Sequence, residues 1–234
     1  MTAARLAGAC IIALACGASA QTTLPAFSTA EPGAALPPPW RVVTLSHRAP
    51  AEVSLVQDDG RTVLRVRSDR AFGTAAITFE AEAPIISWRW KVDRVLERAS
   101  LGTRDGDDYA ARVYVSFEIP PEELSFAERA RLQVARLIYG DVPSAAICYV
   151  WDNKQPRGHS IWSPYGERVR LIVLESGAAS AGQWFEERRD VAADFRAAFG
   201  RPAPKVTGIA AGNDTDQTGE SVTAWFGDFR LERR

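Results

Sequence analysis

The stretch "IISWRWKV", residues Ile85 to Val92, decides the fold class. Every second side chain in it is apolar, and the side chains between are mostly polar or charged. The apolar positions are Ile86, Trp88, Trp90 and Val92. Because successive side chains of a β-strand point to opposite faces, this alternation predicts a strand with one buried and one solvated face. Such a strand belongs to an antiparallel sheet packed on a second layer.

Outward from this stretch, further short runs of strand character alternate with turn clusters from Trp40 to the C-terminus. They are "TVLRVRS", "AAITFE", "ARVYVSFEI", "AAICYVW", "RVRLIVLES", "QWFEERR", "VTGIAAG" and "SVTAWFGDFRL". Their number and spacing are typical of an all-β sandwich, and the helical segments are too few for a parallel sheet. We therefore predict an all-β, single-domain antiparallel β-sandwich of the jelly-roll kind, with one or two peripheral helices.

Two segments have helical character. Residues 121–140 contain strong helix formers and end at a glycine suited to a C-cap. Their expected apolar face consists of Phe126, Ala130, Leu137 and Ile138. Residues 190–200 start with Asp190 as an N-cap and stop at Gly200, which predicts a short second helix.

The first residues, "MTAARLAGACIIALACGASAQ", have the pattern of a secretory signal peptide. One basic residue precedes an apolar run that is too short to span a bilayer, and small residues follow it. A lipoprotein signal with Cys16 as the lipidated residue is the alternative. We expect cleavage after Ala20 and an exported protein, periplasmic or secreted. The expected parts are a signal peptide at 1–20, a Pro/Ala-rich leader at 21–39 and the sandwich domain at 40–234.

The charge balance limits the partners. The chain has 28 Lys and Arg against 29 Asp and Glu, so it lacks the basic excess typical of nucleic-acid binding or of anionic membrane surfaces. No stretch after the leader is apolar enough to span a membrane. Cleavage after Ala20 leaves Cys148, which lies within an expected buried strand and is predicted to be a core residue rather than a nucleophile. Nothing in the sequence indicates an oligomeric state.

A polar loop near the C-terminus, "NDTDQTG" at residues 213–219, resembles two functional motifs in part. It fits the start of a helix-loop-helix calcium loop, but the required glutamate at the twelfth position is Trp225. It also fits the aspartate nucleophile motif of dehalogenase-type phosphatases, but too little chain follows to supply the rest of that domain. We interpret it as a polar loop joining the last two strands, and a hairpin turn is its simplest form.

A second acidic cluster, "RDGDDY", precedes the strand at "ARVYVSFEI". Two separate solvated turns are the simpler interpretation of the two clusters. In the alternative they meet at one end of the sandwich and share a hard cation such as Ca²⁺, because calcium prefers carboxylate and carbonyl oxygens. The candidate metal ligands are Asp105, Asp107, Asp214, Asp216 and Asp228. No other cofactor is indicated.

The remaining polar residues restrict the enzyme hypotheses. With His47 and His159 as the two histidines, a multi-histidine zinc site is excluded. His159 lies in an irregular stretch with Trp162, which is either a binding loop or a surface loop over packed aromatics. A glycosidase needs two carboxylates roughly 5 to 10 Å apart. Glu186 and Glu187 are adjacent on an expected strand and point to opposite faces, so they cannot form that pair.

Several of these stretches together resemble a known family. The segments "ISWRWKVD", "RDGDDYAARVYVSFE", "YVWDNKQPRG", "SPYGERVRLIVLESG", "GQWFEERRDVAADFRAAFG" and "NDTDQTGESVTAWFGDFRL" are similar to the bacterial family of domain of unknown function 3047. The resemblance implies an exported single domain and assigns no activity. It marks these motif positions: Trp90, Asp107, Asp108, Tyr109, Arg112, Trp151, Arg188, Asp190, Asp214 and Asp216. The ending "SVTAWFGDFRL" is also similar to the last strand of jelly-roll carbohydrate-binding modules.

The leading hypothesis is a non-catalytic domain that binds a ligand, such as a glycan, in a polar cleft lined by Asp107, Asp108, Arg112 and Trp162. An enzyme acting on a glycan, with Asp108 and Asp214 as acid and base, is the alternative. A protein-interaction module of the cell envelope is a third hypothesis. The candidate ligand-binding residues are Asp107, Asp108, Tyr109, Arg112, Trp151, His159, Trp162, Arg188, Asp214 and Asp216.

Overall fold

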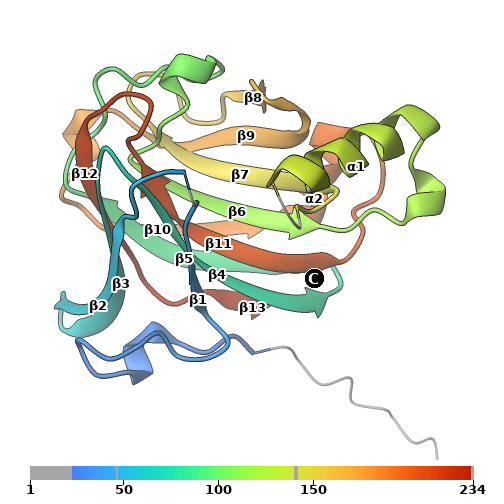
Figure 1. Ribbon diagram of the computed structural model, residues 1–234. Helices are drawn as coiled ribbons and strands as arrows, with labels where there is room; N and C mark the ends of the chain where they lie inside the picture. The colour runs from blue at the N-terminus through green and yellow to red at the C-terminus, as the bar shows by residue number, and fades with distance from the viewer. Residues whose placement is uncertain (1–22, 46, 140–141, 233–234) are drawn as a thin grey trace, which may run out of the picture.

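The computed structural model describes residues 23–45, 47–139 and 142–232. The expected signal peptide at 1–20 and the alternative lipidation site at Cys16 lie outside the described residues. Two β-sheets pack face to face, and the helices lie at the periphery (Figure 1). The predicted all-β sandwich with peripheral helices is confirmed.

The first sheet has seven strands in the order β1-β4-β11-β6-β7-β9-β8. Their bounds, in that order, are Arg41–Val43, Phe72–Ala81, Val206–Asp214, Ala111–Phe117, Ala145–Asp152, Gly166–Ser176 and Ser160–Ser163. The second sheet runs β10-β5-β12-β3-β2, with β13 also paired to β5. Its strands are Phe185–Asp190, Ile85–Val92, Ser221–Phe226, Arg61–Asp69, Glu52–Asp58 and, for β13, Arg230–Glu232. Among the described strands the pairing is antiparallel except between β7 and β9.

Strand β5 has the two faces that its sequence predicts. Its alternate apolar side chains are buried, and Trp90 and Val92 are fully covered. Trp90 packs against Trp151 of the opposite sheet at 5.9 Å between ring centroids, and Trp88 packs against Tyr149 at 5.4 Å. These aromatic contacts join the two sheets across the core, where large apolar side chains contribute most to stability.

The seven-stranded sheet has two chemically different faces. One faces the second sheet and carries Val113, Val115 and Tyr149 in the main core. The other carries a smaller apolar cluster that includes Cys148 and Val150. Cys148 is fully buried and burial raises the pKa of its thiol, as expected for a core residue rather than a nucleophile.

Helix α2, Val191–Phe199, forms as predicted. The Asp190 side chain caps its start by accepting from the Ala193 amide at 3.0 Å. Gly200 ends it with a φ of 68°, a left-handed conformation that glycine adopts without strain. Phe195 is fully buried and contacts Phe117 at 4.7 Å between ring centroids, which holds the helix against the sandwich.

Helix α1, Phe126–Tyr139, starts later than the sequence suggests. Residues 121–123 form a separate 3-10 turn, and Ser125 and Glu128 cap the helix by exchanging hydrogen bonds between side chain and backbone. The expected apolar face is wrong in its first half, since Phe126 is 82% exposed and Ala130 is exposed. Leu132 is buried and belongs to the packed side of the helix, while the side chains of Leu137 and Ile138 lie outside the described part of the structure.

The segment before the first strand also contacts the core. Residues 27–29 form a 3-10 turn, and Phe27 packs against Trp40 and Phe229. Further 3-10 turns lie at Arg104–Gly106 and Ala178–Ser180. In the part of the chain that the structure describes, no helix is long and apolar enough to cross a membrane.

Candidate functional site: a charged pocket at the open edge of the sandwich

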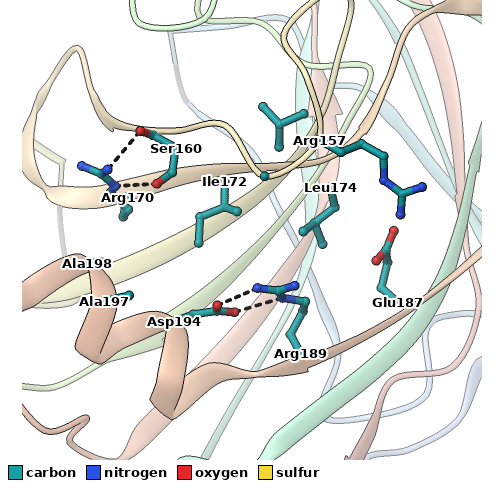
Figure 2. A pocket seen from close by; sticks show the side chains of 12 residues that line it. Arg157, Ser160, Arg170, Ile172, Leu174, Glu187, Arg189, Asp194, Ala197 and Ala198 are labelled. Carbon is teal, nitrogen blue, oxygen red and sulfur yellow. Dashed lines mark hydrogen bonds and ion pairs between the residues drawn. The ribbon is translucent and has the colours of Figure 1, made fainter.

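A pocket of about 420 Å³ lies beside β10, an edge strand of one sheet, and β9, the strand next to the edge strand β8 of the other. Helix α2 and the loop at Arg157–Ser160 complete its wall (Figure 2). The polar side chains that line it are Arg157, Ser160, Arg170, Glu187, Arg189 and Asp194. Its apolar lining includes Ile172, Leu174, Ala197 and Ala198. The pocket therefore combines apolar contact area with a wall of charged hydrogen-bonding groups.

Two glutamates meet beside this pocket. Glu187 on β10 lies opposite Trp88 of β5 and shares its inward face, while Glu175 on β9 lies opposite Trp151 of β7. They come from different sheets, and their side chains are 8% and 2% exposed. The two carboxyl groups lie close enough for each to change the pKa of the other. We call this pair the glutamate pair.

Burial controls the acidity of the glutamate pair. It raises the pKa of Glu187 to about 7, and the charge of Glu175 adds to the effect. The indole Nε1 of Trp90 donates to Glu187 Oε1 at 3.2 Å, which favours the ionised form and opposes the shift. Burial also raises the pKa of Glu175, while Arg157, at 3.0 Å from Glu175 Oε1, lowers it. Glu187 is therefore partly protonated near neutral pH.

The other cations of the pocket are held differently. Arg189 binds Asp194 through two hydrogen bonds of 3.0 and 2.6 Å, and Asp194 also accepts from the Tyr149 hydroxyl at 2.7 Å. Arg170 instead donates to Ser160, to the hydroxyl at 2.6 Å and the carbonyl at 2.9 Å, and lies over the ring of Trp162 at 4.9 Å. Among the described residues, Arg170 has no carboxylate within ion-pair distance.

The two acidic clusters of the sequence meet in a second place, in the loops that precede β6 and follow β11. Asp108 accepts from the Thr218 amide at 2.6 Å, and Asp214 accepts from the Tyr109 amide at 3.1 Å. The interpretation as two separate turns is therefore wrong. The hairpin turn is also wrong, because the 213–219 loop connects β11 in one sheet to β12 in the other, and β13 follows.

This meeting point, which we call the aspartate cluster, is buried and partly neutralised. Arg112 contacts Asp214 at 2.7 Å with both side chains about 5% exposed or less, and Arg48 contacts Asp216 at 2.8 Å. Asp107 accepts from the Tyr109 hydroxyl at 2.8 Å, and burial raises its pKa to about 6. These bonds tie together loops from distant parts of the chain.

Three carboxylates of the aspartate cluster could hold a cation. One oxygen from each of Asp108, Asp214 and Asp216 lies within 4.8 Å of the other two. Two of them already bind a guanidinium, which a cation would have to share or displace. Calcium at these residues therefore stays a prediction. The other metal candidates lie elsewhere: Asp105 is exposed, and Asp228 accepts from the backbone and side chain of Ser28.

The aspartate cluster does not offer a glycosidase pair in an open groove. Asp108 and Asp214, the acid and base of the enzyme hypothesis, are 0% and 3% exposed and accept backbone hydrogen bonds. Glu175 and Glu187 are 2% and 8% exposed, so the glutamate pair does not lie in an open groove either. Neither arrangement favours glycoside hydrolysis by two carboxylates.

The expected cleft of Asp107, Asp108, Arg112 and Trp162 is not formed. Trp162 pairs with Arg170 on the inward-facing side of the seven-stranded sheet, whereas Arg112 pairs with Val150 on the other side. A sheet separates them because side chains alternate along each strand.

The other candidates lie apart from the aspartate cluster. Trp151 is 1% exposed in the core. His159 is half-buried, and its two neighbours in sequence, Gly158 and Ser160, line the pocket. Arg188 is exposed on the outer face of β10, where it pairs with Glu232 at 2.8 Å.

Most residues of the pocket were missed by the sequence reasoning. They include Arg157, Arg170, Glu187, Arg189 and Asp194. One signal was present in the sequence. Glu187 lies two residues after Phe185 on the same strand, so both point inward, while Glu186 is exposed, as the alternation predicts. A charged residue at an inward position of an edge strand indicates a functional or paired group.

The fold and pocket define a class, a β-sandwich with a ligand-sized polar pocket at one open edge. The chain matches the family described as "Protein of unknown function (DUF3047)" over residues 38–230, and it belongs to that family. The resemblance seen in the sequence is thereby confirmed. No curated protein matches the chain.

The chain is similar to several solved structures at low identity. "Cellulose induced protein, Cip1" has 12% identity and a TM-score of 0.42, with 83% of this chain and 91% of that chain covered. The xyloglucanase domain of NopAA from Sinorhizobium fredii, solved with cellobiose, has 9% identity, a TM-score of 0.44 and the same two coverages. Endoglucanase 3 of Trichoderma harzianum, from family GH12, has 5% identity, a TM-score of 0.42 and coverages of 86% and 100%. These likenesses concern the fold alone.

Proposed function

We propose that this protein binds a small glycan, without catalysing a reaction, in the pocket beside β9, β10 and α2. The observation that carries the proposal is the pocket itself, about 420 Å³ with charged side chains above an apolar floor. That volume lies within the usual range of roughly 300–1,000 Å³ for small-molecule sites and suits a mono- or disaccharide.

The lining matches the two kinds of surface of a sugar. Ile172 and Leu174 offer apolar contact to the C–H groups of a ring. Guanidinium and carboxyl groups around them offer donors and acceptors to hydroxyl groups. Several of these groups are already fixed: Arg189 by Asp194, and Arg170 by Ser160 (Figure 2). Fixed side chains lose little conformational entropy on binding, which favours affinity.

Titration calorimetry against a panel of neutral and acidic mono- and disaccharides tests the proposal. We expect at least one sugar to bind the wild-type chain, and Ala197→Trp to abolish that binding because the indole fills the pocket. Arg196→Trp is the matched control, since Arg196 is exposed on the same helix and does not line the pocket. The proposal fails if no sugar binds, or if Ala197→Trp binds as well as the wild type while remaining folded.

A further inference from the structure

The charges of the pocket do not cancel. Three guanidinium groups line it, those of Arg157, Arg170 and Arg189. Arg189 pairs with Asp194 and Arg157 pairs with Glu175, while burial raises the pKa of the remaining carboxyl group, Glu187, to about 7. The pocket then keeps an excess of positive charge, and the cation without a carboxylate partner is Arg170.

The geometry of Arg170 leaves part of its guanidinium for a ligand. Its hydrogen bonds run from Nε and Nη2 to Ser160, and none runs from Nη1 among the described residues. The ring of Trp162 covers one face of the group at 4.9 Å. Two bonds to Ser160 and an aromatic ring therefore fix the orientation of a charged group that lines the pocket. An arginine held in this way is suited to recognise a planar anion.

Arg157 is a second cation of the pocket, and its exposed side chain can change conformation when a ligand binds. Its side chain is 63% exposed, and it contacts Glu175 at the edge of the pocket. Figure 2 shows its guanidinium turned toward Glu187, across the pocket floor from Arg170. Because burial raises the pKa of Glu187 to about 7, this carboxyl group is partly protonated near neutral pH and repels an incoming anion less than an ionised carboxylate would.

Resting on the proposed function, we infer that the glycan bound in this pocket carries a carboxylate group, as a uronic acid does. Arg170 binds the carboxylate, and Arg157 adds a second, screened attraction from the pocket edge. The apolar floor at Ile172 and Leu174 contacts the sugar ring. Ion pairs of this kind weaken with added salt, because the pocket is open to solvent.

The test compares each acidic sugar with its own methyl ester, which removes the charge and keeps the ring. The probes are digalacturonate and glucuronate, their methyl esters, and inorganic phosphate as a different anion. We expect an acid to bind the wild-type chain at least tenfold more tightly than its ester, with a preference that shrinks as sodium chloride is raised. Phosphate is expected to bind at least tenfold more weakly than that acid.

Substitutions then show which residues cause the preference for the acid over its ester. Arg170→Gln is expected to reduce the preference for the acid over its ester to about onefold, while the ester still binds. Arg157→Gln, a change at an exposed side chain, is expected to reduce this preference in part. Arg188→Gln is the matched control, because Arg188 lies on the outer face of β10 and pairs with Glu232. Circular dichroism confirms that each variant is folded, and Arg157→Gln carries the test if Arg170→Gln does not fold.

The outcomes separate the two proposals. Equal binding of acid and ester, or a preference that survives in both arginine variants, overturns the carboxylate inference and leaves glycan binding standing. Binding of phosphate in place of every sugar overturns both and indicates a general anion site. If no probe and no neutral sugar binds, the proposed function fails, and the carboxylate inference fails with it.

Discussion

At the scale of single residues, the buried acids determine how this protein responds to pH. Glu187 faces inward beside Trp90 and Glu175, in a place where most proteins have apolar side chains. Asp214 is equally buried but has Arg112 as a partner. Burial raises the pKa of both carboxyl groups, and at Asp214 the guanidinium of Arg112 opposes this rise.

The stability of the protein is expected to fall as the pH rises from 5 to 7. The pKa of Glu187 is about 7 in the folded chain, above its ordinary value of 4.5. Between these values the folded state keeps a proton that the unfolded state has lost, so each pH unit costs up to about 1.4 kcal/mol. This stabilisation is complete below pH 4.5 and is lost as the pH rises through 7.

Urea unfolding at pH 5 and pH 7 measures this effect. Glu187→Gln should show a smaller loss of unfolding free energy between the two pH values than the wild type. Glu186→Gln, a change on the exposed side of the same strand, should leave the loss unchanged. Equal pH dependence in wild type and Glu187→Gln would contradict the assigned role of Glu187.

Removing the partner of Arg112 is expected to be strongly destabilising. Asp214→Ala leaves a guanidinium that is about 5% exposed without its counter-charge and takes the acceptor from the Tyr109 amide. Breaking a buried ion pair in this way costs about 3–5 kcal/mol. Chemical denaturation measures the loss. Arg188→Ala is the control, because it breaks an exposed ion pair and should change stability by about 0.5 kcal/mol or less. A similar loss of unfolding free energy in both variants would show that burial does not cause the loss in Asp214→Ala.

At the scale of elements, strand β10 and helix α2 form one unit that shapes the pocket. The strand supplies Glu187 and Arg189 from its inward face, and the helix follows without a loop and supplies Asp194. Asp190, at the junction, caps the helix. The ion pair between Arg189 and Asp194 then joins the strand to the first turn of the helix.

Loss of the cap should weaken both the helix and the pocket. Asp190→Ala is expected to lower the unfolding free energy by about 1 kcal/mol, because the Ala193 amide loses its acceptor. Asp190→Ser restores a capping oxygen and should recover most of that loss. Thermal and urea unfolding of the two variants provide the measurement, and equal stability of both would argue against a capping role.

At the scale of the whole molecule, the aspartate cluster joins the two sheets through the loop from β11 to β12. The calcium predicted from the sequence would act there. If calcium binds, millimolar Ca²⁺ is expected to raise the unfolding temperature relative to EDTA, by native-state binding. Asp216→Asn should remove the rise, while Asp228→Asn should preserve it, because Asp228 is not one of the three grouped carboxylates. An unfolding temperature that does not respond to Ca²⁺ or EDTA would exclude the calcium prediction.

The sequence by itself determined most of the strands, the faces of β5 and β10 and the capped helix α2, but it missed β1, β2 and β8. These features depend on neighbours one to four residues apart, and the alternation of Trp88 and Trp90 or the cap at Asp190 is visible in the chain. Tertiary structure alone decided which residues share a site. Glu175 meets Glu187, and Asp108 meets Asp214, through the order and register of strands distant in sequence. The position of a residue along its strand fixes the face of the sheet on which its side chain lies, because side chains alternate. The order of the strands decides which other side chains it contacts on that face.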